Sequence, residues 1–278
     1  MTPRWTRSYE LALRTSLAGW AWLPVALMSM ALAGARKALR LPGVWCGAFL
    51  LMSAVASAQS AETLAAWERY VVAAESRLER LRDRPAPRPS ENEAITASGD
   101  SVRVPSGTIS DWHGTVFIRG VTLDQLWHHL LHPGTPPPQE DVVAARVIAR
   151  SDDCLRVSVR LVRHAIVSVT YDTEHEMRFR RWTPQLATAR SVATRVEEVG
   201  GTDHGFLWRL HSYWRYEEID GGVLVELESL TLSRDVPSII RPIAAPLVTR
   251  IARESVLRTL ESLRHFFNTE DSQDTKGR

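Results

Sequence analysis

Cysteine is scarce in this chain, whose 278 residues include only Cys46 and Cys154. Cys46 lies in a segment that we expect to be removed on export, and no small-residue pattern typical of lipid attachment precedes it. An internal disulfide is therefore excluded in the mature chain. The composition, 44% hydrophobic and 24% charged residues, is ordinary for one large globular domain or two small ones.

Several catalytic signatures are also missing. The stretches GTISD and GGTDHG lack the strand-turn-helix setting of a serine nucleophile, and no histidine lies near Cys154 in the sequence. No glycine-rich phosphate loop opens a helix, and we expect no cofactor. These absences weaken an enzymatic interpretation without removing it, because the members of a catalytic triad can lie far apart in sequence.

A basic surplus is absent from most of the chain. The formal net charge is +2, but residues 59–278 hold 28 basic and 31 acidic residues, so the basic excess belongs to the first 58. The charge therefore gives no argument for a nucleic-acid partner, and we expect none.

The N-terminal segment has the three parts of a secretory signal. Arg36, Lys37 and Arg40 precede an uncharged run over 41–60, which contains Ala-Ser-Ala at 56–58. Basic, apolar and small-residue regions in this order predict an export segment over 1–58, cleaved after the alanine at 58. The mature protein is then expected to be periplasmic or secreted.

A second uncharged segment, residues 15–35, leaves an alternative open. It is long enough to span a bilayer, although Pro24 interrupts it. Either translation starts at Met28 or Met30, or residues 15–60 form a helical hairpin that anchors the protein in the membrane. We favour export because the small-residue cleavage site is well formed.

The remaining chain divides into four parts. Residues 59–84 have apolar positions at helical spacing and predict a helix, and the proline-rich segment 85–105 predicts a linker. A folded domain is expected over 106–268, followed by a polar tail over 269–278.

Within that domain the pattern changes twice. A strand is predicted over 108–120, and a short helix capped by Thr122 follows it and stops at Pro133. Period-two alternation then predicts an antiparallel meander of six strands. We place these strands at 142–150, 155–162, 166–179, 188–199, 206–218 and 223–233. The chain closes with a long helix whose apolar stripe runs from Val248 to Phe267.

This order of elements is that of the α+β helix-grip fold, a curved antiparallel sheet wrapped around a long C-terminal helix, here preceded by an extra N-terminal helix. Over 108–267 the sequence resembles the START-like (SRPBCC) superfamily, and most of all its uncharacterised exported bacterial members. The segments that carry the resemblance include GTVFIRGVTLDQL, TYDTEHEMRF, GFLWRLHSYWRYEE, GGVLVELESLTLSRDVP and ARESVLRTLESLRHFF. The resemblance implies a cavity between the sheet and the last helix, and one fold hosts many functions.

The last hairpin predicts one wall of that cavity. A two-residue turn at 220–221 sets its register and separates an apolar face from a charged one. The face that we expect to bind ligand carries Trp208, Leu210, Ser212, Trp214, Tyr216, Val225, Leu227, Ser229 and Thr231. We expect Arg215 and Glu226, on the other face, to form a solvent-exposed pair. The aromatic residues could equally pack on the last helix without any ligand.

The stretch YDTEHEMRF offers a histidine between two glutamates. Strand alternation places His175 with Tyr171 on one face, and Glu174 and Glu176 on the other, so the three cannot converge on one site. We expect His175 and Tyr171 to line the cavity, and a general acid or base role for His175 is the alternative.

A short predicted helix carries Asp124, His128 and His132 four residues apart on one face, a spacing that would permit metal binding. Because its apolar stripe lies on the opposite face, we expect this row to be on the surface and to hold no metal.

The sequence thus predicts an exported protein that binds a hydrophobic small molecule or lipid, with membrane association through the N-terminal segment as a further option. Two alternatives remain open: a cyclase-type or hydrolase-type enzyme that uses the same cavity, and a scaffold whose core is filled and whose first helix docks a partner.

Overall fold

The computed structural model describes residues 59–85, 94–133, 142–164, 168–200, 207–235 and 241–274. The expected export segment, and with it the alternative membrane hairpin over 15–60, lies almost wholly outside these ranges. Within them, none of the helices combines the length and the apolar character needed to cross a membrane.

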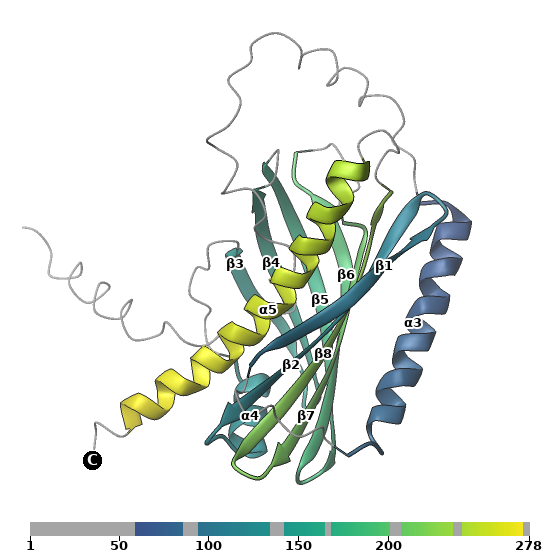
Figure 1. Ribbon diagram of the computed structural model, residues 1–278. Coiled ribbons are helices and arrows are strands. Elements are labelled where there is room, and N and C mark those ends of the chain that lie inside the picture. Colours follow the sequence, from purple (N-terminus) through teal and green to yellow (C-terminus); the bar gives the residue numbers. More distant parts are fainter. Residues whose placement is uncertain are drawn as a thin grey trace, which may run out of the picture.

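One antiparallel sheet dominates the described part of the chain (Figure 1). Its strand order is β1-β2-β8-β7-β6-β5-β4-β3. The strands are β1 (Thr96–Val104), β2 (Gly107–Arg119), β3 (Val142–Arg150), β4 (Cys154–His164), β5 (Ser168–Thr183), β6 (Leu186–Glu198), β7 (Arg209–Ile219) and β8 (Gly222–Arg234). The helices are α3 (Ala61–Leu81), α4 (Leu123–Leu131) and α5 (Arg241–Asp274).

The predicted meander is confirmed. Strands β3 to β8 pair in sequence order, and the turn at 220–221 sets Ile219 opposite Gly222 and Trp214 opposite Leu227. Gly221 has a φ of 82°, a conformation that glycine adopts without strain and that two-residue hairpin turns require. The strand β2 then returns to pair with β8.

Helix α5 lies across one face of this sheet, which we call the inner face, and this arrangement is the expected helix-grip fold (Figure 1). Its residues Val256 and Leu260 approach β2 at Gly114. A Cβ atom at that glycine would lie 2.7 Å from Leu260 Cδ1 and closer still to Val256. The absence of a side chain at 114 therefore allows the helix to sit directly on the strand.

The expected linker over 85–105 is wrong in its second half, because 96–104 forms β1. Its sequence is polar and its side chains are mostly exposed, so it lacks the apolar alternation that predicts a strand. Strand β1 is specified instead by its pairing with β2 through a tight turn. In that turn, Pro105 has a fixed φ and Ser106 a positive one of 57°.

The outer face of the sheet, opposite α5, is covered in part by α3 (Figure 1). Trp67 and Ala74 of α3 pack with Ile109, Tyr213 and Leu230 from β2, β7 and β8 in a second apolar cluster. Trp67 also meets the ring of His211 edge-on, with 5.1 Å between the ring centroids. Helix α3 therefore belongs to the folded domain.

We expected Arg215 and Glu226 to form a solvent-exposed pair, and this expectation is wrong because α3 covers this part of the outer face. The Arg215 side chain is only 1% exposed and that of Glu226 14%. Arg215 donates to Glu226 at 2.7 Å, to the backbone oxygen of Arg84 at 2.8 Å and to Glu217. Charges can be buried here because each one is matched.

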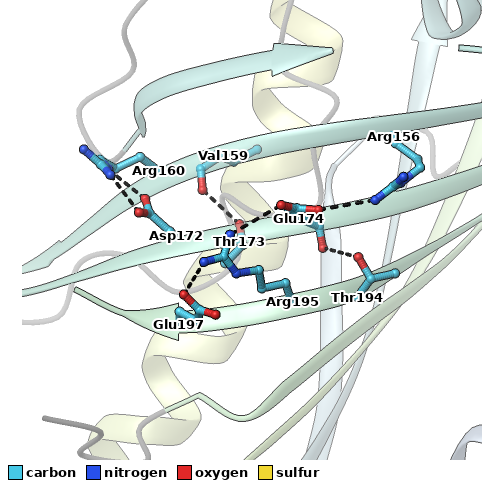
Figure 2. A network of polar contacts seen from close by, with 9 residues as sticks. All are labelled: Arg156, Val159, Arg160, Asp172, Thr173, Glu174, Thr194, Arg195 and Glu197. Carbon is cyan, nitrogen blue, oxygen red and sulfur yellow. Dashed lines mark hydrogen bonds and ion pairs between the residues drawn. The ribbon is translucent and has the colours of Figure 1, made fainter. Parts of the chain in front are cut away.

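The outer face over β4 to β6 is open to solvent and carries exposed charged residues (Figure 2). Arg160 donates two hydrogen bonds of 2.7 Å to Asp172 on the neighbouring strand. Glu174 accepts from Arg156 at 3.4 Å and from Arg195 at 3.5 Å. The same face of one sheet thus has a covered half and a solvated half.

Replacing Arg215 with Met should test this division. The change leaves Glu217 and Glu226 without their buried partner, so we expect the free energy of unfolding to fall by about 3–5 kcal/mol. Arg156→Met, which breaks an exposed pair, is the matched control and should change it by no more than about 1 kcal/mol. Denaturant unfolding measures both, and equal small effects would mean that α3 does not cover this half of the sheet.

Candidate functional site

Between residues 187 and 193, strand β6 lines the inner face with small side chains only. Ala187, Ala189, Ser191 and Ala193 alternate along the strand, and all four are buried. Larger residues flank them on the neighbouring strands, where Trp214 and Tyr216 stack at 6.1 Å between ring centroids. The side chains of β6 therefore project less from the inner face than those of the neighbouring strands.

We call the small side chains at 187, 189, 191 and 193 of β6 the small-residue track. Three serine hydroxyl groups lie side by side across it, on neighbouring strands. Ser191 on β6 pairs with Ser212 on β7, which pairs with Ser229 on β8. The Ser212 Oγ accepts a 3.0 Å hydrogen bond from Trp214 Nε1. Ser191 Oγ is buried and has no hydrogen-bond partner among the described residues.

His175 lies one step away on β5, opposite Ala193 and diagonal to Ser191. Its side chain is confirmed on the inner face, and the residue is 1% exposed. Burial lowers the pKa of His175 to about 3, and the charge of nearby His211 adds to the shift, so the ring is neutral at pH 7.

The hydrogen bonds of the ring set its tautomer. Thr173 Oγ1 donates its proton to the Val159 oxygen at 3.1 Å, so it can only accept from His175 Nε2, which lies 3.2 Å away. The proton of the neutral ring is therefore on Nε2. Nδ1 is left as a buried acceptor with no partner among the described residues.

Most of the residues that we predicted to line a cavity lie on the inner face of the sheet. The residues placed there by the strand pairing are Leu210, Ser212, Trp214, Tyr216, Val225, Leu227, Ser229, Thr231, Tyr171 and His175. All of them are buried except Thr231, which is partly buried. The predicted separation of His175 from Glu174 is confirmed too, since Glu174 joins the outer network of Figure 2.

Trp208 is the exception. We expected it on the cavity wall, but it packs in the outer cluster with Trp67 and Leu232, while the preceding Leu207 belongs to the inner core. The strand β7 begins only at Arg209, so the alternation that places Leu210 inside does not extend back to 208.

Two hollows are described, and both are lined by charged residues of the outer face. One, of about 500 Å³, lies between α3 and the sheet and is lined by residues that include Arg77, Arg84, His113 and Glu228. The other, of about 360 Å³, lies over β3 to β6 beside the network of Figure 2.

The three residues of the expected surface row on α4 do not converge as one group of three ligands. Asp124 pairs with Arg181, and the rings of His128 and His132 stack at 4.7 Å. Among the described residues, a group of three potential ligands forms elsewhere, on the outer face.

That group consists of Asp111, His113 and Glu228, whose ligand atoms lie within 4.8 Å of one another. Sequence analysis missed it. The i, i+2 spacing of Asp111 and His113 on a strand was visible, but their pairing with Glu228 depends on contacts between β2 and β8, which are more than a hundred residues apart.

The strand order and α5 define the class of this protein as an α+β helix-grip domain, the fold that the sequence resemblance implied. No family model and no curated protein sequence matches the chain.

Similar solved structures include lipid-transfer proteins and an aromatase/cyclase. A STAR-related lipid transfer protein from Xanthomonas axonopodis is 14% identical, and the match covers 60% of this chain and 98% of that one, with a TM-score of 0.42. Human StAR-related lipid transfer protein 5 is 13% identical over 73% of this chain and 99% of that one, with a TM-score of 0.39.

The ZhuI aromatase/cyclase from Streptomyces sp. R1128 is 12% identical over 60% of this chain and 96% of that one, with a TM-score of 0.35. With similarities this low, the fold assignment rests on the strand order and on α5 rather than on these matches.

The low pKa of His175 predicts acid sensitivity. Below pH 6.5 the unfolded chain binds a proton at this position that the folded protein does not, so stability is lost as the pH falls from 6.5 towards 3. Between pH 7.5 and pH 5 we expect His175 to account for a loss of about 2 kcal/mol, which His175→Gln should remove.

Urea unfolding of both proteins at the two pH values measures this difference. His132→Gln, at an exposed histidine, is the control and should keep the acid sensitivity of the unaltered protein. An unchanged pH dependence in His175→Gln would show that the ring is not buried in its neutral form.

Proposed function

We propose that this protein binds a hydrophobic small molecule or lipid between the inner face of the sheet and α5. The observation that supports this most directly is the pair of buried, unpartnered polar atoms, His175 Nδ1 and Ser191 Oγ, beside the small-residue track of β6. Buried polar groups are normally paired, and a ligand that lies along β6 would supply the missing partner.

The charges of the interior favour a neutral ligand. The buried charged residues described, Asp111, Arg215 and Glu228, all lie on the outer face, and His175 is neutral at pH 7. A carboxylate on the inner face would therefore be desolvated without a cation to pair with.

The ligand should also donate a hydrogen bond. His175 Nδ1 carries a lone pair and no proton, so it needs a donor such as a hydroxyl group. An elongated hydrophobic alcohol meets both requirements. A carboxylate, which is charged and can only accept, meets neither.

Two alternative functions receive less support. A general acid or base works best with a pKa near the working pH, and the pKa of His175 is about 3. A partner-docking role for α3 would need a free apolar stripe, but Trp67 and Ala74 of α3 are buried against its own sheet.

A pair of fluorescent probes with the same alkyl chain tests the proposal, one ending in a hydroxyl and the other in a carboxylate. At pH 7.5 we expect the alcohol to bind at least about tenfold more tightly than the acid, because the acid must be desolvated without a partner. Fluorescence titration of the purified protein measures both affinities, and equal or reversed affinities would contradict the proposed ligand chemistry.

A bulky side chain in the small-residue track of β6 tests whether the ligand binds there. Ser191→Phe should leave the protein folded and abolish binding of the alcohol probe, because the ring occupies the space along β6. Thr194→Phe, on the same strand but exposed, is the control and should bind as before. If Ser191→Phe instead lowers the free energy of unfolding by about 1–3 kcal/mol and the unaltered protein binds neither probe, the interior is filled by its own side chains.

We also propose that the protein acts outside the cytoplasm. The basic, apolar and small-residue parts of the segment over 1–58 support cleavage after Ala58. N-terminal sequencing of the protein from its native cells should begin at Gln59. A sequence that begins before Leu41 would support the membrane-anchored alternative instead.

A further inference from the structure

The outer face carries a second polar site, which lies apart from the inner-face track. Asp111 and His113 alternate on β2, so their side chains share one face, and His113 pairs directly with Glu228 on β8. His113 Nε2 lies 3.1 Å from Asp111 Oδ1, and His113 Nδ1 lies 4.0 Å from Glu228 Oε2. An imidazole and two carboxylates thus converge from adjacent strands.

Both carboxylates are withdrawn from solvent. Asp111 is 9% exposed and Glu228 is 6% exposed. Arg77 of α3 pairs with the two of them, donating to Asp111 Oδ2 at 2.9 Å and also to Glu228. One guanidinium therefore faces two carboxylates, and the local charge is balanced only in part.

One oxygen of the Asp111 carboxylate could bind a further group. Its Oδ1 is buried, and its nearest potential donor is the exposed ring of His113, whose Nε2 lies 3.1 Å away. Buried carboxylate oxygens are normally satisfied, and a cation held between Oδ1 and the imidazole nitrogen would satisfy both atoms.

There is room for such a group next to the cluster. The hollow of about 500 Å³ under α3 is lined by both His113 and Glu228. The His113 side chain is 47% exposed, so its ring can be reached from solvent.

We propose that Asp111, His113 and Glu228 bind a divalent transition-metal ion such as Zn²⁺, in competition with the guanidinium of Arg77. An imidazole nitrogen favours Zn²⁺ over Mg²⁺ or Ca²⁺, which prefer sites made of oxygen atoms alone. Three protein ligands leave a coordination position for water, for which the hollow offers space. The ion and Arg77 compete because both need the same carboxylate oxygens.

Calorimetric titration of Zn²⁺ into the full-length protein tests this site. The stacked pair His128 and His132 on α4 could bind the ion on its own, so both are first replaced with Ala in the test protein. We expect one Zn²⁺ per chain in this background. His113→Ala should weaken its binding by at least about tenfold, as the loss of a ligand does.

Arg77 variants distinguish competition from simple structural support. Arg77→Gln should strengthen Zn²⁺ binding by about tenfold, because the resident cation is removed. Arg77→Lys keeps the positive charge but cannot hold two carboxylates in a fork. Its affinity for Zn²⁺ should therefore lie between those of Arg77→Gln and the unaltered protein. If Arg77→Gln does not fold, the direction of the change in Arg77→Lys decides the question.

Thermal melting of each variant confirms that the protein being titrated is folded. The proposal is overturned if the background protein binds no Zn²⁺, if His113→Ala leaves the affinity unchanged, or if the folded Arg77 variants bind the ion more weakly than the unaltered protein.

Discussion

Trp214 and Leu227 form one cross-strand pair of the β7–β8 hairpin, and Arg215 and Glu226 form the next pair. Because successive residues of a strand point to opposite faces, the first pair faces α5 and the second faces α3. A register shift of one residue would exchange these faces and place the charges in the apolar core. The turn at 220–221 fixes the register, so the inner-face track and the outer-face cluster both depend on it.

The buried charged groups of the outer face have charged partners, whereas His175 and Ser191 on the inner face each keep a polar atom without a partner among the described residues. On the outer face, Arg215 has three acceptors, and Arg77 joins Asp111 to Glu228. On the inner face, His175 Nδ1 has none among the described residues. Matched groups of the first kind hold elements together, whereas an unmatched acceptor beside small side chains is typical of a site completed by a ligand.

Local patterns in the sequence predict much of this architecture. Alternation and turn residues predict the meander, the register of the last hairpin and the inner position of His175, because each depends on residues close together in the chain. The missed features depend on distant partners. Strand β1 is polar and is held by β2, and α3 packs on strands as far away as β7 and β8. Trp208 lies just outside the alternating segment.

The bridge made by Arg77 also orders the assembly of the fold. Its two acceptors, Asp111 and Glu228, lie 34 and 151 residues further along the chain, on strands that pair with each other. The apolar stripe of α3 packs on residues of β7 and β8, so it cannot be fully buried until these strands are present. During synthesis, the first described helix of the chain must wait for nearly all of the domain before its apolar stripe is buried.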